Sequence, residues 1–210
     1  MPPLIAPIIL ACGLAVLAAE TGWRRLFYVA KPVATLLILL QVGFFQSIAP
    51  PAARLPLLTA LTLSLVGDVL LMVPGDLFKP GLLSFLLAHI AYLAAFGTRL
   101  THAPPALALA ALGAVVGLAL RWMGPGMGSM RLPTGVYGLA MGLVVWAAWG
   151  AWSEEGRITA GLGVAGGLLF MASDILLAVR RFRGAFPASH ALTLALYYAG
   201  QILLSQSFVV

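Results

Sequence analysis

The chain is built from long apolar runs separated by short polar segments. Charged residues, prolines and glycines delimit eight runs, at residues 4–19, 26–46, 55–73, 81–98, 105–122, 133–152, 158–180 and 187–208. Most of these runs are close in length to the span of about 20 residues that a helix needs to cross a bilayer. Five of them have a proline at or near the first turn, where a missing amide hydrogen costs little: Pro56, Pro80, Pro105, Pro133 and Pro187. The pattern predicts an all-α membrane protein with eight transmembrane helices.

The composition excludes an ordinary soluble domain. Of the 210 residues, 62% are hydrophobic and 9% are charged, whereas soluble domains carry roughly 25% charged residues. The net charge of +6 would suggest nucleic acid as the partner of a soluble protein. Here the basic residues stand at the ends of apolar runs, where they orient helices. We therefore expect residues 1–210 to form a single integral membrane domain in a lipid bilayer, with no nucleic-acid partner.

Lysine and arginine are divided unevenly between the two sides of the predicted bundle. One side carries Arg24, Arg25, Lys31, Lys79, Arg121, Arg131, Arg180, Arg181 and Arg183. The other side carries only Arg54, Arg99 and Arg157. By the positive-inside rule the first side faces the cytoplasm. This predicts both termini on the non-cytoplasmic side of the membrane, which we expect to be a bacterial inner membrane.

Polar residues recur at a constant spacing of 106 positions. Asp68 lies in a Gly-Asp-Val-Leu-Leu segment and Asp174 in a Ser-Asp-Ile-Leu-Leu segment. The same offset carries Lys31 onto Tyr137 and Tyr92 onto Tyr198. Four helices separate the equivalent elements, so two four-helix halves, 1–104 and 105–210, would share one orientation as a parallel repeat. Coincidence in a chain rich in leucine and alanine is the alternative interpretation.

The depth of these groups in the membrane follows from the helix rise of 1.5 Å per residue. Counted from the predicted helix ends, one layer about 6 to 12 Å from the cytoplasmic boundary contains five groups: Asp68, Asp174, Lys31, Tyr137 and His89. Tyr198 and Gln201 lie deeper, at about 16 and 21 Å. The layering predicts a pocket that opens from the cytoplasmic leaflet.

Asp68 and Asp174 are the strongest catalytic candidates. An ionisable group inside a spanning helix costs several kcal/mol and usually marks a functional site. The alternative is that each acid only holds helices together through a lysine or tyrosine. Two acids in different surroundings can differ in protonation state, so that one donates a proton while the other remains ionised. That pair is what general acid and general base catalysis requires, and we favour Asp174 as the acid and Asp68 as the base.

The other polar residues of this layer have two interpretations each. Lys31 precedes Pro32, which places it near a predicted helix start, where it can pair with Asp68 or anchor the helix at the interface. His89 and Tyr92 are three residues apart and share a helix face, and His89 is either a packed group or a catalyst. Tyr137, Tyr198 and Gln201 either line a pocket or bond between helices. With no Cys and His cluster, phosphate loop or GxSxG elbow, we expect no metal and no cofactor.

Five segments in this order resemble the YhhN-type lysoplasmalogenase family: Lys31-Pro32, residues 67–71, residues 89–92, residues 169–174 and residues 198–203. The resemblance covers the chain from the second helix to the last, with Gly200 where the family pattern has alanine. It implies an eight-helix membrane enzyme that cleaves the vinyl ether bond of lysoplasmalogen, a lysophospholipid, giving a fatty aldehyde and a glycerophospho head group. It also implies Asp68 and Asp174 as the paired acids, and as pocket residues Lys31, His89, Tyr92, Tyr137, Ser173, Tyr198 and Gln201.

The chemistry of this reaction suits the two acids. Vinyl ether hydrolysis begins with proton transfer to the alkene carbon, and water then attacks the oxocarbenium ion that forms. The reaction needs an acid, a base and a stabilising negative charge, all of which two carboxylates supply. Two alternatives remain open at this point: a small proton-coupled transporter that uses the same acids, and a structural or lipid-organising membrane protein without turnover.

Overall fold

The computed structural model describes residues 3–210, which form eight α-helices and two short 3-10 helices. The α-helices are α1 (Ile5–Thr21), α2 (Arg24–Phe45), α3 (Arg54–Met72), α4 (Phe78–Gly97), α5 (Ala106–Met123), α6 (Arg131–Glu155), α7 (Ile158–Phe182) and α8 (Ser189–Gln206). The 3-10 helices are η1 (Pro51–Ala53) and η2 (Gly124–Met130). Every α-helix begins and ends within about three residues of an apolar run, a deviation typical of helix ends, so the predicted all-helical class is confirmed.

Six of the helical segments are long and apolar enough to cross a membrane, and they include α2 to α7. The apolar helix α1 has 17 residues and is shorter. The predicted position of Lys31 near a helix start was wrong. Helix α2 begins at Arg24, so Lys31 lies two turns inside it and Pro32 lies in its interior.

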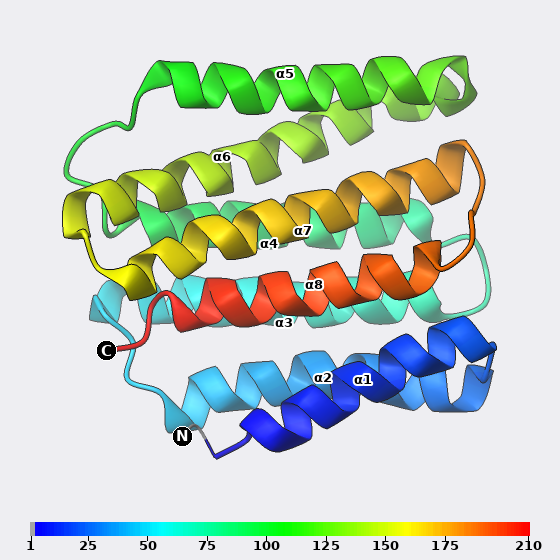
Figure 1. Ribbon diagram of the computed structural model, residues 1–210, viewed down its shortest axis with the longest axis horizontal. Coiled ribbons are helices and arrows are strands. Elements are labelled where there is room, and N and C mark those ends of the chain that lie inside the picture. The colour runs from blue at the N-terminus through cyan, green and yellow to red at the C-terminus, as the bar shows by residue number, and fades with distance from the viewer. Residues whose placement is uncertain (1–2) are drawn as a thin grey trace.

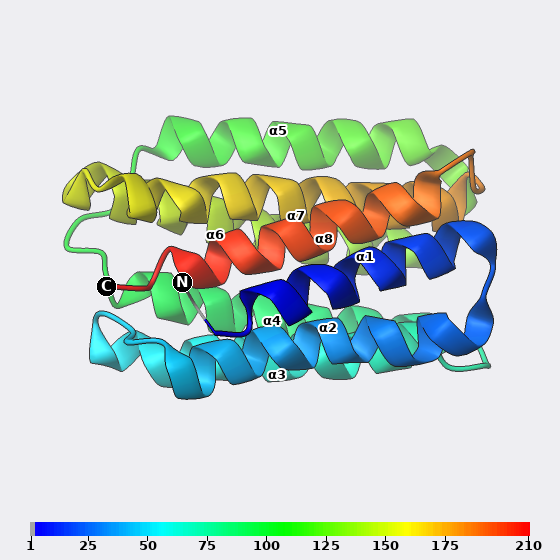
Figure 2. The same ribbon diagram turned by 60° about the horizontal axis from the view of Figure 1, so that its bottom comes forward.

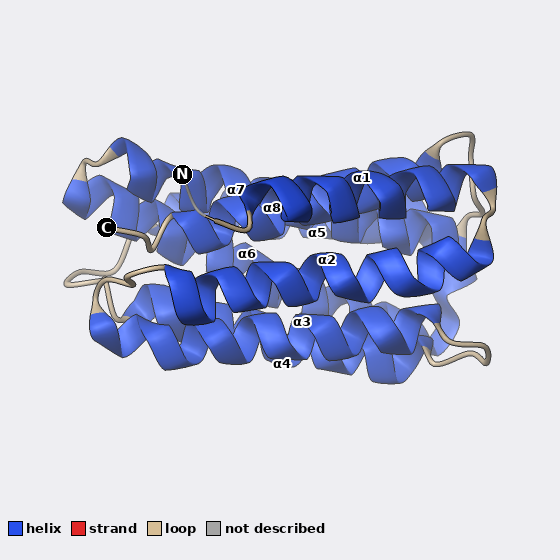
Figure 3. Ribbon diagram, turned by 90° about the horizontal axis from the view of Figure 1, so that it is seen from below, coloured by secondary structure: helices blue, strands red, loops and turns tan. Residues whose placement is uncertain are grey.

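The eight helices run side by side along the long axis of the molecule (Figure 1). Both described ends of the chain lie at one end of the bundle, and the connections α1–α2, α3–α4, α5–α6 and α7–α8 lie at the other (Figures 1 and 2). Viewed from below, loops gather at the two ends only (Figure 3). Helices α3 and α4 pack together, as do α7 and α8, and α1 packs against both α2 and α8.

The bundle has apolar side chains outside and polar side chains inside. Ile158, Leu107 and Phe44 are 88%, 81% and 77% exposed. The buried polar groups include Lys31, Gln41, Asp68, His89 and Gln201. This is the arrangement expected when lipid is the solvent, because polar groups then seek one another in the interior.

The closest approach of α7 and α8 depends on two glycines. A Cβ on Gly166 would lie 2.6 Å from the backbone nitrogen of Leu204, and one on Gly200 would lie 2.9 Å from the carbonyl oxygen of Gly166. Small residues of this kind let helix backbones meet. The contact explains why glycine replaces alanine at position 200.

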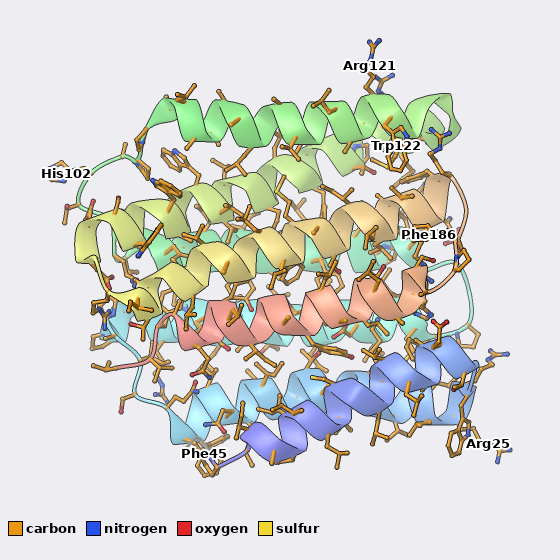
Figure 4. All side chains as sticks on the ribbon, viewed as in Figure 1. Arg25, Phe45, His102, Arg121, Trp122 and Phe186 are labelled. Carbon is orange, nitrogen blue, oxygen red and sulfur yellow. The ribbon has the colours of Figure 1, made fainter. Side chains whose placement is uncertain are left out.

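The two ends of the bundle carry the two unequal groups of basic residues. Arg25 and Arg121 lie at the end with the α1–α2 and α5–α6 connections, whereas His102 and Phe45 lie at the end with the termini (Figure 4). The first end, where the nine basic residues of the larger group lie, is called the basic end below.

Candidate functional site

A cavity of about 710 Å³ lies at the basic end. Its outer lining includes Asp76 and Leu77 from the α3–α4 connection and Arg180 from the last turn of α7. Its inner lining includes both candidate acids, Asp68 on α3 and Asp174 on α7. The predicted pocket at this end of the bundle is therefore present, and it reaches the two acids.

Asp68 is held by a full set of donors. The Nζ atom of Lys31 lies 3.2 Å from Oδ1 and donates to the backbone oxygen of Asp68 at 3.1 Å. The hydroxyls of Thr35 and Tyr197 donate to Oδ2 at 2.6 and 2.7 Å. The side chains of Lys31 and Asp68 are only 8% and 2% exposed. A buried carboxylate needs this kind of compensation, and the neighbouring cation favours its charged form.

A chain of hydrogen bonds continues behind Asp68. Gln201 donates to the hydroxyl of Tyr197 at 3.2 Å and accepts a hydrogen bond from the hydroxyl of Tyr92. Tyr198 donates to the backbone oxygen of Lys31 at 3.3 Å. Tyr197 lines the cavity, whereas Tyr92, Tyr198 and Gln201 support it and Lys31 without lining the cavity.

Asp174 has far fewer partners. Tyr137 donates to its Oδ1 atom at 2.8 Å, and the Nε2 atom of His89 lies 3.7 Å from Oδ2, beyond hydrogen-bond distance. Among the described residues, Oδ2 and both ring nitrogens of His89 have no hydrogen-bond partner. The His89 ring packs against Tyr137 and Phe170, with centroids 4.8 and 5.1 Å away. Asp174 is 11% exposed and is thus the less enclosed of the two acids.

The nine residues singled out from the sequence lie together in one part of the bundle. Four of them line the cavity: Lys31, Asp68, Ser173 and Asp174. The Ser173 hydroxyl donates to the backbone oxygen of Thr193 at 2.9 Å. The other five are His89, Tyr92, Tyr137, Tyr198 and Gln201, and they lie behind the lining, in contact with the two acidic centres or with the residues that support them.

Two direct partners of Asp68, Thr35 and Tyr197, are not among the pocket residues predicted from the sequence. Thr35 follows Lys31 by four residues and therefore shares its helix face. Tyr197 precedes Gln201 by four residues on α8. Helical spacing from Lys31 and Gln201 is the signal that points to both residues.

Each acid has a contacting residue at the same sequence separation before it. Lys31 precedes Asp68 by 37 residues, and Tyr137 precedes Asp174 by 37 residues. The equivalent positions of the predicted repeat thus supply a lysine in one case and a tyrosine in the other. Helices α3 and α7 thus each present an acid to the cavity, with a lysine beside one acid and a tyrosine beside the other.

Arginines surround the mouth of the cavity. Arg181 forms an ion pair with Asp76, and its guanidinium holds the pKa of that carboxyl below its usual range. The pair is therefore charged at neutral pH. Arg24 donates a hydrogen bond to the hydroxyl of Tyr28 at 3.0 Å, and Arg180 lines the same space.

Comparison with known proteins identifies the family. The family model described as the YhhN family matches residues 26–208. The human lysoplasmalogenase TMEM86B is 33% identical over 185 residues, covering 87% of this chain and 76% of the human one. The human lysoplasmalogenase TMEM86A is 30% identical over 198 residues, covering 91% and 81% of the two chains.

A bacterial relative is similar over almost its whole length. The membrane protein YhhN of Escherichia coli O157:H7 is 30% identical over 209 residues, which cover 95% of each chain. No solved structure matches the chain. The match of the family model over residues 26–208 confirms the resemblance of the five segments, and the chain belongs to the YhhN family.

Proposed function

We propose that this protein hydrolyses the vinyl ether bond of lysoplasmalogen or a related lysolipid. The observation that carries the proposal is the pair of aspartates that line one cavity. Asp68 is bound by a lysine and two hydroxyls, whereas Asp174 has one hydrogen-bond donor among the described residues. The names of the two human relatives, both lysoplasmalogenases, support the choice of substrate class.

In the proposed mechanism the two acids have different roles. Asp68 remains ionised because Lys31 lies beside it and two hydroxyls donate to it. Asp174 has no lysine or arginine in its ion pairs among the described residues, so it is the group that can carry a proton into the cavity. Asp174 is then the general acid, and Asp68 is the base that orients water.

The proposed reaction proceeds in three steps. Asp174 donates its proton to the alkene carbon remote from the ether oxygen, leaving an oxocarbenium ion stabilised by the negative charge of Asp68. Water attacks the carbon bonded to oxygen and gives up a proton to Asp68. The hemiacetal then breaks into a fatty aldehyde and a free glycerol hydroxyl, and the proton returns to Asp174 through water.

In the membrane arrangement that we propose, all eight α-helices cross the bilayer, and not only the six long apolar segments. Helix α8 is not among these six segments, and it buries the polar residues Tyr197, Tyr198 and Gln201. We propose residues 1–210 as one domain made of two parallel repeats, 1–104 and 105–210, supported by the common 37-residue spacing. The charge difference between the ends supports termini on the non-cytoplasmic side, in a bacterial inner membrane.

The test is aldehyde release by the purified protein in detergent from a lysolipid with a vinyl ether bond. In heavy water the mechanism predicts one deuterium at the carbon next to the aldehyde group, because that carbon receives the catalytic proton. Absence of aldehyde, combined with proton-coupled uptake by the same protein in sealed vesicles, would contradict the hydrolase function and favour a transporter. A detergent solution has no gradient, so transport cannot imitate the hydrolysis result.

A further inference from the structure

The mouth of the cavity has a surplus of positive charge that belongs to two particular arginines. Among the charged residues of the lining, Lys31 is paired with Asp68, and Arg181 is paired with Asp76. Arg24 and Arg180 line the same cavity, and neither has a carboxylate in the ion pairs of the described residues. The mouth therefore offers two guanidinium groups to an anion.

The local contacts of these two arginines leave donors free. Arg24 donates to the neutral hydroxyl of Tyr28, and the Nε atom of Arg180 is buried without a partner among the described residues. A guanidinium presents several donors in a planar fork that matches phosphate oxygens. Unsatisfied donors at a cavity mouth are costly unless a ligand or water meets them.

A general excess of positive charge at the basic end does not explain why Arg24 and Arg180 line the cavity. Arg25 and Arg121 lie at the same end, but their side chains project away from the bundle (Figure 4) and do not line the cavity. They can orient the helices by the positive-inside rule without facing a ligand. Arg24, which is adjacent to Arg25, lines the cavity instead.

The separation of the two arginines from Lys31 and Asp174 along their helices is comparable to the length of a glycerophosphate head group. Arg180 follows Asp174 by six residues on α7, and Arg24 precedes Lys31 by seven on α2. At 1.5 Å per residue these separations are about 9 and about 10 Å along the helix axis. Five bonds join phosphorus to the vinyl ether oxygen of a glycerophospholipid, a reach of about 6 Å in an extended chain. A charge-assisted hydrogen bond adds about 2.8 Å.

We propose that Arg24 and Arg180 bind the phosphate of a glycerophosphate head group, one glycerol unit away from the bond that is cleaved. This inference rests on the proposed function and adds the two residues that select a lysolipid with a phosphate ester over the same lipid without phosphate. A lipid head group and free inorganic phosphate share this chemistry, so the experiment separates them.

The experiment measures binding to the full-length protein in detergent, with a lysolipid that cannot be hydrolysed. The probe is a 1-alkyl lysophospholipid with a saturated ether chain, and the comparison ligand is the same alkylglycerol without phosphate. We expect R24Q and R180Q each to weaken binding of the lysophospholipid about tenfold, the usual loss for a hydrogen bond to a charged group. Binding of the alkylglycerol stays unchanged.

Matched variants separate a binding role from a structural one. R25Q and R121Q remove the same charge at the same end of the bundle, and we expect wild-type binding from both. R180K retains the charge but loses the planar fork, so its affinity lies between those of R180Q and the wild type. D76N releases Arg181 from its ion pair and strengthens binding of the lysophospholipid several-fold. Thermal unfolding without ligand shows that each variant is folded.

Three results would overturn the phosphate site. The first is wild-type affinity in both R24Q and R180Q, and the second is an equal loss of lysophospholipid and alkylglycerol binding. The third is inorganic phosphate binding as tightly as the lysophospholipid, which would make the site a free-phosphate site. Failure of vinyl ether hydrolysis leaves the binding difference intact, so failure of the proposed function and failure of this inference are distinguishable.

Discussion

Asp68 on α3 and Asp174 on α7 lie 106 residues apart in similar apolar segments, yet their surroundings differ in charge. Asp68 is bound by Lys31, Thr35 and Tyr197. Asp174 accepts one hydrogen bond, from Tyr137. Two aspartates in similar sequence segments therefore have different sets of partners, and the proposed mechanism assigns them different roles on this basis.

The difference originates in the residue 37 positions before each acid. A lysine at that position provides a fixed positive charge, whereas a tyrosine provides a neutral donor. The nearby cation favours the ionised acid, and burial without a cation favours the protonated one. In the proposed mechanism, the exchange of this lysine for a tyrosine is what separates the base from the acid.

The largest expected effect is on the rate of hydrolysis when either acid loses its ability to ionise. D68N and D174N should each lower kcat by about 10² to 10⁴, the usual contribution of general acid or base catalysis. Aldehyde release from a vinyl ether lysolipid measures the effect. E20Q, at an exposed carboxylate at the end of α1, is the control and should retain the wild-type rate. Full activity of either asparagine variant in folded protein would remove that acid from the mechanism.

The second largest effect is on stability, when Asp68 or Asp174 loses its main partner. K31M leaves the Asp68 carboxylate buried without its cation, which should lower the free energy of unfolding by about 3 to 5 kcal/mol. Y137F removes one hydrogen bond from Asp174 and should cost about 1 to 3 kcal/mol. Unfolding in detergent compares the two variants, and adding D68N to K31M should recover part of the loss. Equal losses from K31M and Y137F would indicate that the two centres are not charged differently.

The smallest effect is on the rate after loss of a single hydroxyl. Y137F removes the one hydrogen-bond donor that Asp174 has in the described part of the chain and should lower kcat about tenfold. Y197F leaves Asp68 with Lys31 and Thr35, so its kcat should fall less than about threefold. KM should change little in both variants, because neither hydroxyl is proposed to contact the head group. The reverse order of kcat values would contradict the assigned partners.

The helices were predictable because apolar runs and prolines mark their ends in a bilayer protein. The location of Asp68 and Asp174 inside the bundle was predictable for a related reason, since ionisable residues inside such runs are rare. Lys31 was placed at a helix start because Pro32 follows it, but a proline can also lie within a long membrane helix whose neighbours satisfy the backbone.

Other parts of the site depend on how each helix is rotated about its axis. Thr35 and Tyr197 are ordinary helix residues in the sequence. They become hydrogen-bond donors to Asp68 only through the packing of α2 against α3 and α8. Arg24 and Arg25 are adjacent and chemically identical, yet only Arg24 lines the cavity. A one-residue step turns a side chain by about 100° in a helix of 3.6 residues per turn, and the sequence does not specify this rotation.

The division of roles between the two acids is tested most directly by the pH dependence of kcat/KM. A base must be ionised, so the rate rises with pH through its titration, and an acid must be protonated, so the rate falls through its titration. The wild type should show both limbs. The residual activity of D68N should lack the rising limb, and that of D174N should lack the falling limb. Retention of both limbs in both variants, or loss of the opposite limb in each, would contradict the assignment of Asp174 as acid and Asp68 as base.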